Sequence, residues 1–336
     1  MRTYLLPEQG TFYKANLHCH TTFSDGSLTP SEVRELYRKN GYSVVAFTDH
    51  EVLVPHPELR TPDFLPLNGV EVSIIEKDRR DKSGKKFHFC CIALEESNVL
   101  TPCFHPDNLH HNAAELRTLV RPEPKSFGLP HDYTPEQINR LMGLAKEAGF
   151  FLTYNHPDWS LEDFDTYSQY VGMDALEVYN NCCNCIGYEA YVPNAYEALL
   201  RHGRRLFCVY ADDNHNDRDD ACGGWVMIKA DELEYNTIGK ALLDGHFYAS
   251  TGPEITALWF DGAHLHVECS AAESVSLIYG VKKAERHAAA GKERITASEF
   301  VIDPNYRWFR VHVEDGRGHF ADTHAYYMDE LTFGEA

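Results

Sequence analysis

The sequence predicts an α/β protein, a barrel of parallel strands followed by a small all-β sandwich. Through about residue 245, apolar runs of strand length alternate with helical segments, a pattern typical of parallel strands with helices packed outside them. Nearly every polar candidate for a functional role follows directly after an apolar strand, as in the active site of a barrel enzyme. After about residue 252, short strands separated by turn residues replace this alternation, which favours a sandwich.

The expected barrel begins with a strand at Phe12–Leu17. A helix should follow, because Thr29 can cap it, a proline is tolerated in its first turn and Glu32 completes a capping box. Gly41 should end this helix. Further strands are expected at Ser43–Thr48, Phe64–Val70 and Lys86–Leu94.

A second unit of the same kind begins at Thr134, which caps a helix that should end at Gly149. The remaining elements of the expected barrel are strands at Phe150–Tyr154, Ala175–Tyr179 and Leu206–Tyr210, and a helix around Ala190–His202. Residues 95–133 interrupt the alternation. They are rich in proline and histidine, so we expect an insertion or lid with little regular structure.

Thr251-Gly252-Pro253 is the expected boundary between a barrel domain at residues 1–252 and a sandwich domain at residues 253–336. Hairpin turns are expected at Asp261-Gly262 and Asp315-Gly316. The strands expected beyond the boundary are Ala257–Phe260, Leu265–Glu268, Val275–Tyr279, Glu299–Ile302, Phe309–Val313 and Ala325–Tyr327. We expect this domain to have a structural role, by packing on the barrel or on a second subunit of a homo-oligomer.

Composition indicates a globular cytoplasmic protein. No apolar run approaches the ~20 residues of a membrane span, and the first residues lack the features of a secretory signal. The formal net charge of −20 argues against a general nucleic-acid binder, which needs a cationic face. The ten cysteines are expected to be free thiols. Cys182, Cys183 and Cys185 form one C-x-x-C without a second pair, so we interpret them as ordinary thiols.

The most informative segment is N-L-H-C-H-T-T-F-S-D at residues 16–25, which places His18, His20 and Asp25 after a strand. An H-x-H on a strand points both imidazoles to one face. Two imidazoles beside a carboxylate suit zinc, manganese or iron.

Similar residues follow the other strands. The complete set of candidate metal ligands is His18, His20, Asp25, His50, Glu71, His88, His156, Asp213 and His215. So many ionisable groups would be costly to bury without metal ions. Nine ligands exceed what one four-coordinate ion can use, so we expect two or three divalent transition-metal ions that share a carboxylate.

These residues resemble the motifs of the PHP (polymerase and histidinol phosphatase) family, over roughly residues 12–250. The matching pieces are H-C-H with Asp25, T-D-H at 48–50, G-V-E at 69–71, His88, N-H-P at 155–157 and D-N-H at 213–215. The resemblance implies a distorted (β/α)₇, TIM-like barrel with its metals at the C-terminal mouth. Gly245–Pro253 with a β-rich tail is similar to a subgroup of this family that carries a C-terminal sandwich.

The resemblance also implies how the ligands are shared. One ion would bind His18, His20, Glu71 and Asp213, a second Glu71, His88 and His156, and a third Asp25, His50 and His215. Glu71 would bridge the first two ions. The catalytic residues we predict on this basis are Glu71, His156 and His215.

The expected activity is that of a metal-dependent hydrolase that cleaves a phosphate ester, either a phosphomonoester or a nucleotide, with a metal-activated hydroxide. The expected partner is therefore a small phosphorylated substrate. Three alternatives remain. The same site could hydrolyse a non-phosphorus bond such as a carbamate, ester or lactone, it could trim nucleic-acid ends, or the chain could be a non-catalytic binding protein.

Several residues near the ligands are secondary candidates. Asp49 is interpreted either as a partner that orients His20 or as a structural residue. Asp212 is interpreted either as a partner that orients a ligand histidine or as an exposed residue. Asn155 and Asn180 are expected to hydrogen-bond ligands or substrate. The basic residues between Glu71 and His88 are interpreted as an exposed hairpin tip, with contact to a substrate phosphate as the alternative; they are Arg79, Arg80, Lys82, Lys85 and Lys86. Arg218 is interpreted as a surface residue, with a position facing the pocket as the alternative. His105, His110 and His111 are interpreted as surface histidines, with closure of one of them over the site as the alternative.

Overall fold

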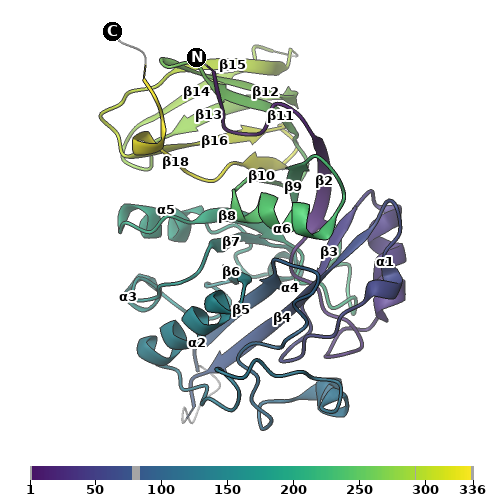
Figure 1. The fold of residues 1–336 in the computed structure, drawn as a ribbon. Coiled ribbons are helices and arrows are strands. Elements are labelled where there is room, and N and C mark those ends of the chain that lie inside the picture. Colours follow the sequence, from purple (N-terminus) through teal and green to yellow (C-terminus); the bar gives the residue numbers. More distant parts are fainter. Residues whose placement is uncertain (1, 78–83, 292, 334–336) are drawn as a thin grey trace.

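The structure, a computed structural model, describes residues 2–77, 84–291 and 293–333. It consists of a mixed α/β region with a large sheet and a β-rich region stacked on it (Figure 1). The strands of the mixed region are β2 (Thr11–Asn16), β3 (Val44–Phe47), β4 (Leu65–Ile75), β5 (Lys86–Ala93), β6 (Phe150–Tyr154), β7 (Ala175–Asn180), β8 (Phe207–Ala211), β9 (Trp225–Ala230) and β10 (Phe247–Ser250).

The two helices expected from capping signals begin and end close to where those signals place them. Thr29 caps α1 (Pro30–Lys39) and forms the predicted capping box with Glu32. Thr134 caps α2 (Pro135–Glu147) by accepting a hydrogen bond from the backbone of Gln137. The other helices of this region are α3 (Phe164–Tyr167), α4 (Asn181–Ile186), α5 (Pro193–Arg201) and α6 (Tyr235–Leu243), with short 3₁₀ turns η1 (Pro57–Leu59) and η2 (His111–Leu116).

The large sheet is not parallel throughout, which corrects the sequence-based expectation. Strands β2, β3 and β4 pair in parallel, and so do β6, β7 and β8. However, β5 is antiparallel to both of its neighbours, and β9 is antiparallel to β2. The reason is the short connection between β4 and β5, since a parallel neighbour requires a crossover of a dozen or more residues.

The first and last strands of the β2-to-β8 series meet at their carboxyl ends. Just beyond these strands, Cys19 and Asn214 form one parallel bridge. The backbone N–H of Asp213 donates to the carbonyl of His18 at 3.0 Å, and that of His20 donates to the carbonyl of Asn214 at 3.0 Å. These hydrogen bonds bring the H-C-H and D-N-H segments together, although they lie almost 200 residues apart in the chain.

The β-rich region contains two sheets around a shared apolar core. One sheet has the order β1-β11-β12-β15, and the other end of the large sheet has the order β14-β13-β16-β17-β10. Leu258, Val267, Leu277 and Val311 are fully buried between them. The bounds are β1 (Thr3–Tyr4), β11 (Ile255–Phe260), β12 (His264–Ala272), β13 (Ser274–Ile278), β14 (Ala284–Ala288), β15 (Ile295–Val301), β16 (Trp308–Glu314), β17 (Phe320–Asp322), β18 (Tyr326–Tyr327) and the 3₁₀ turn η3 (Met328–Glu330).

The two regions share strands at their junction. β10 pairs with both β9 and β17, so the large sheet runs without a break from one region into the other. The first strand of the chain, β1, joins the β-rich region by pairing with β11. The division at residue 252 stays a prediction. Two strand pairs cross this position: β10 with β17, and β1 with β11. None of the helices described has the length and apolar character needed to span a membrane.

Candidate metal centre

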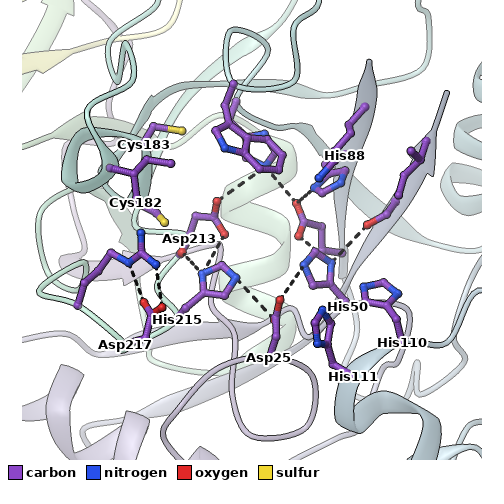
Figure 2. Close-up of a pocket in the computed structure, with 18 residues that line it drawn as sticks. Asp25, His50, His88, His110, His111, Cys182, Cys183, Asp213, His215 and Asp217 are labelled. Atoms are coloured by element: carbon purple, nitrogen blue, oxygen red, sulfur yellow. Dashed lines mark hydrogen bonds and ion pairs between the residues drawn. The ribbon is translucent and has the colours of Figure 1, made fainter. Parts of the chain in front are cut away.

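The candidate site is a cavity of about 320 Å³ at the end of the sheet where β2, β3 and β8 finish (Figure 2). One wall is the β4–β5 hairpin, where the register pairs Glu71 with Cys90 and Ser73 with His88. Because side chains alternate along a strand, Glu71 and Ser73 share one face of β4. His88 lies near the start of β5, not at its end. Since β5 is antiparallel, its start lies at the same end of the sheet as the carboxyl ends of the parallel strands.

The first group of side chains converges beside this cavity, which its members Glu71 and Asp213 line. His18 Nε2 lies 3.2 Å from Glu71 Oε1 and 3.2 Å from Asp213 Oδ1. His20 Nε2 lies 3.3 Å from Glu71 Oε2 and 3.1 Å from Asp213 Oδ1. All four side chains are buried, and each offers one ligand atom within 4.8 Å of the others.

The second group shares Glu71 with the first. Glu71 Oε1 lies 3.2 Å from His88 Nδ1 and 3.4 Å from His156 Nε2. Again the ligand atoms of the three residues lie within 4.8 Å of one another. Glu71 therefore belongs to both groups, as a carboxylate shared by two ions would have to.

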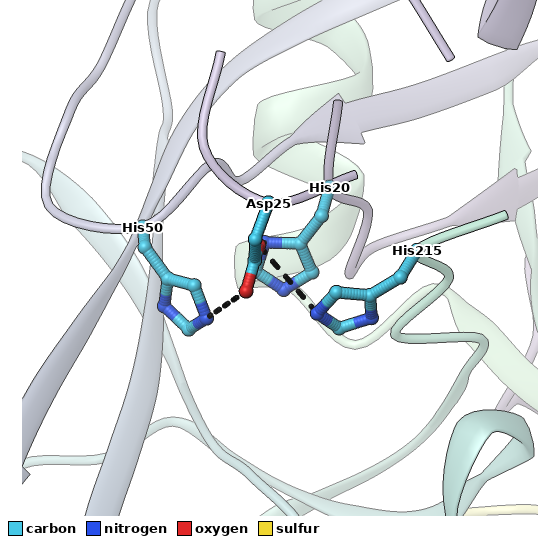
Figure 3. Close-up of side chains that lie close together, drawn as sticks. All are labelled: His20, Asp25, His50 and His215. Carbon is cyan, nitrogen blue, oxygen red and sulfur yellow. Dashed lines mark ion pairs between the residues drawn. The ribbon is translucent and has the colours of Figure 1, made fainter. Parts of the chain in front are cut away.

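The third group surrounds Asp25, as Figure 3 shows. Its carboxylate oxygens lie 3.7 Å from His50 Nε2, 3.6 Å from His215 Nε2 and 3.7 Å from His20 Nδ1. This group contains the three residues expected for a third ion and adds His20, which also belongs to the first group. The structure thus brings all nine sequence-predicted residues into one cluster.

The electrostatics of this cluster fit divalent cations. Glu71 and Asp213 form ion pairs only with histidines among the described residues; no Lys or Arg there neutralises either carboxylate. Burial raises the pKa of Asp213, but nearby imidazoles, that of His18 first among them, hold it well below its ordinary range. A carboxylate that stays ionised while buried needs a cation, and the histidine nitrogens that point to these oxygens are the donors that zinc, manganese and iron accept.

The orientation of His18 supports the same conclusion. Its Nδ1 lies 2.9 Å from Glu177 Oε1, so this nitrogen carries the proton and donates it to that carboxylate. Its Nε2 faces Glu71 and Asp213, and in the neutral ring this nitrogen presents its lone pair to them. A lone pair that faces two carboxylates is repelled unless a proton or a metal ion lies between them.

Sequence reasoning missed Glu177. It lies in β7, accepts the hydrogen bond from His18 and also accepts the backbone N–H of His156 at 3.0 Å through its other oxygen. It is 1% exposed. The sequence did contain a signal for Glu177, since it is a carboxylate within the otherwise apolar strand Ala175–Tyr179. A buried carboxylate in such a strand must have a hydrogen-bond or ionic partner.

The backbone is also unusual at two of the ligands. His156 has φ +31° and Asp213 has φ +53°, a left-handed conformation that costs about 1–3 kcal/mol for a residue other than glycine. The hydrogen bonds from their N–H groups to Glu177 and to the carbonyl of His18 hold this conformation. No sequence signal predicts it.

Two acidic candidates prove to support loops and make no direct hydrogen bond to a ligand side chain. Asp49 accepts the backbone N–H and hydroxyl of Thr21 and the hydroxyl of Ser24, each at 2.8 Å, which fixes the turn before Asp25. Asp212 is fully buried and accepts backbone N–H groups from residues 222–224 and the hydroxyl of Tyr37. Burial raises the pKa of Asp212 to about 6 despite these hydrogen bonds.

The two asparagines contact ligand carboxylates. Asn155 Nδ2 donates to Glu71 Oε1 at 3.0 Å. Asn180 Nδ2 donates to Glu177 Oε2 at 2.8 Å and to Asp213 Oδ2 at 3.2 Å. Both amides therefore help to fix the direction in which these carboxylates point.

The rim of the cavity is formed by residues expected at the surface. His110 and His111, at the start of η2, line it, and the His110 ring centroid lies 5.2 Å from that of His50. Arg218 lines it too, although its guanidinium is paired with Asp217 at 2.7 Å. The cavity is also lined by Cys182, Cys183, Ile75, Lys86, Trp159 and Ile186. Of the basic cluster, Arg79, Arg80 and Lys82 lie outside the described residues.

Comparison with known proteins gives matches at the level of structure only. No protein-family model matches the chain, and no curated protein matches its sequence. One similar structure is a two-domain protein from Bacteroides vulgatus that contains a predicted PHP-like metal-dependent phosphoesterase. The identity is 17%, the match covers 93% of each chain, and the TM-score is 0.46.

Two further structures are similar over less of the chain. A candidate metal-dependent phosphoesterase from Bifidobacterium adolescentis is 18% identical, with 71% of this chain and 98% of that chain covered and a TM-score of 0.37. An amidohydrolase from Chromobacterium violaceum, with bound sulfate and no metal, is 19% identical over 61% of this chain and 89% of that chain, with a TM-score of 0.39. The chain is similar to PHP-like proteins, the family whose motifs its sequence resembles.

Proposed function

We propose that the protein is a metal-dependent hydrolase that cleaves phosphate esters. The observation that carries this proposal is the convergence of Glu71 and Asp213 with buried histidines at one end of the sheet, without a Lys or Arg partner among the described residues. A structural ion would be enclosed by its ligands, whereas this cluster opens into a cavity where a substrate can reach it.

The residues that would hold the ions are the three groups described above, with Glu71 common to the first two. When bound there, divalent ions supply positive charge for the phosphoryl oxygens and lower the pKa of a water molecule. We place two or three ions in the cluster, because no single four-coordinate ion can use nine ligands.

The side chains of the protein contribute orientation and charge. Glu177 fixes the ring of His18 and the backbone of His156, and Ser160 Oγ lies 3.1 Å from Nδ1 of the His156 ring. His156, His215 and the shared carboxylate Glu71 all line the cavity. We therefore assign the main catalytic contribution to Glu71, His156 and His215.

A distorted (β/α)₇ barrel is the architecture we propose for residues 12–250. Support comes from the bridge between Cys19 and Asn214, which joins the ends of the first and last strands of the series. Such closure brings ligands from all of these strands to one mouth, as in other barrel enzymes.

The test is phosphate release from phosphomonoesters, nucleotides and short oligonucleotides, with manganese, zinc and iron supplied in turn. We expect release that requires metal and that the Glu71→Gln variant loses by at least ~10³-fold, since it removes the shared carboxylate. Glu285→Gln, an exposed position on β14, is the matched control and should retain full activity.

A parallel panel of esters, lactones and carbamates tests the alternative reaction. Hydrolysis confined to that panel, in protein with bound metal confirmed by elemental analysis, would replace phosphoester cleavage by attack on a carbonyl carbon. Equal phosphate release by wild type and Glu71→Gln would contradict the assignment of the site.

A further inference from the structure

Lys86 is the one lysine among the described residues that lines the catalytic cavity. It is the first residue of β5 and lies on the same face as His88, because side chains two apart on a strand share a face. The register pairs Lys86 with Ile75 at the rim, one step outward from the pair of His88 and Ser73. The strand therefore places an ammonium group between the candidate ligands and solvent.

The indole of Trp159 holds this ammonium in place. Lys86 Nζ lies 4.5 Å from the centroid of the Trp159 ring, within the range of a cation–π interaction. The same ring lies 5.0 Å from His156 and 5.7 Å from His88, centroid to centroid. A single indole ring thus packs near both the lysine and two candidate ligands. The backbone N–H of Lys86 donates to the carbonyl of Ser160, which connects the start of β5 to the segment that follows Trp159.

Within the described part of the chain no carboxylate forms an ion pair with Lys86, whose ammonium contacts the Trp159 ring. Its neighbour Lys85 differs, since Nζ of Lys85 pairs with Asp163 at 3.3 Å and donates to Thr166 at 2.6 Å. Arg218, the other permanent cation at the rim, is paired with Asp217. Lys86 is therefore the rim cation whose charge is available to a ligand.

We infer that Lys86 binds a second anionic group of the substrate, so that the site selects phosphoesters whose organic part carries a carboxylate or a further phosphate. The inference rests on the proposed function, which places the scissile phosphate at the metal ligands. A cavity of about 320 Å³ admits a small molecule that spans both positions. A neutral alcohol in the same position would leave the ammonium without a partner.

The first arm of the test compares matched substrates by phosphate release with manganese present. 3-Phosphoglycerate is compared with glycerol 3-phosphate to test the carboxylate, and fructose 1,6-bisphosphate with fructose 6-phosphate to test the second phosphate. We expect kcat/KM to be about two- to fivefold higher for at least one doubly anionic member, mainly through KM, as a partly exposed ion pair allows. Lys86→Met should abolish this ratio, Lys86→Arg should retain most of it, and Lys85→Met should leave activity and ratio unchanged.

The second arm measures binding without turnover. Isothermal titration of 3-phosphonopropionate and of propylphosphonate compares two non-hydrolysable ligands that differ by one carboxylate. Tighter binding of 3-phosphonopropionate to wild type, lost in Lys86→Met and kept in Lys86→Arg, supports the inference for a carboxylate. Failure to release phosphate from any compound would contradict the proposed function alone. Two results would overturn the role of Lys86. One is a kcat/KM ratio near one for both substrate pairs together with equal affinities for the two phosphonates. The other is a ratio above one that Lys86→Met leaves unchanged.

Discussion

Nδ1 of His18 lies 2.9 Å from Oε1 of Glu177, and both side chains are 1% exposed. This hydrogen bond fixes which nitrogen of His18 carries the proton and directs the other nitrogen toward Glu71 and Asp213. Carboxylates that orient ligand histidines typically change metal affinity by 10- to 100-fold when they are replaced. The most direct prediction about the site concerns this pair.

Glu177→Gln should weaken metal binding by about 10- to 100-fold. Glutamine can still accept from His18 through its oxygen, but its NH₂ group would then face the N–H of His156 and the amide of Asn180, which are both donors. The measurement is the dissociation constant for manganese by competition with a chelator, with Glu189→Gln, an exposed neighbour, as the control. Equal affinities in Glu177→Gln and wild type would show that His18 needs no such orientation.

Removal of divalent ions should lower the melting temperature. Metal that binds only the folded chain stabilises it by about 2.7 kcal/mol at a concentration 100 times the dissociation constant. We expect a chelator to lower Tm, manganese to restore it, and Glu71→Gln to show a smaller shift, because this residue belongs to two of the ligand groups. A Tm that responds to neither chelator nor metal would argue that the cluster binds no ion.

Arg310→Met should destabilise the protein by about 3–5 kcal/mol, the usual cost of leaving a buried charge unpaired. Arg310 is 4% exposed and lies between Asp322, at 2.6 Å, and Glu197 of α5, at 2.7 Å. It therefore connects the β-rich region to the helix layer. Urea unfolding measures the loss, and Arg286→Met, whose ion pair with Glu314 is exposed, should change stability by less than about 1 kcal/mol. A similar small change in Arg310→Met would indicate that packing alone holds this junction.

Glu162 should make stability fall as pH rises. Burial raises its pKa from 4.5 to about 7, against the opposing effect of hydrogen bonds from Tyr133, Tyr154 and Tyr170. Below pH 4.5 both the folded and the unfolded chain hold this proton, whereas between 4.5 and 7 only the folded chain does. The contribution of the protonated carboxyl is therefore complete below 4.5 and is lost as pH rises through about 7, a change of about 3 kcal/mol.

The measurement is urea unfolding of wild type and Glu162→Gln at pH 4.5, 6 and 8. Because the glutamine does not titrate, the stability of wild type relative to the variant should decrease over this range. Glu268→Gln, at an exposed position of β12, controls for the other carboxylates. A difference between wild type and Glu162→Gln that is independent of pH would show that Glu162 titrates near its ordinary value.

The local signals in the sequence located most strands and helices that carry the site. Thr29 and Thr134 cap helices where predicted, and the apolar runs before His18, His50, His156 and Asp213 are strands. The strands that escaped prediction, β1, β9, β10, β14 and β17, are short or exposed, or lie where chain regions join. Their pairing partners are distant in sequence, so a local pattern carries little information about them.

The sequence by itself determined which ligand-type residues lie within or directly after the strands, and therefore the nine candidate ligands and the class of metal they suit; Glu71, expected after a strand, lies within β4. Only the tertiary structure decided how these residues meet. The antiparallel direction of β5 brings His88 to the mouth, Glu177 reaches His18 across the sheet, and Lys86 faces Trp159 while Lys85 faces Asp163. The physical reason is that ligand chemistry is a property of each side chain, whereas convergence depends on strand direction, register and backbone hydrogen bonds between segments far apart in the chain.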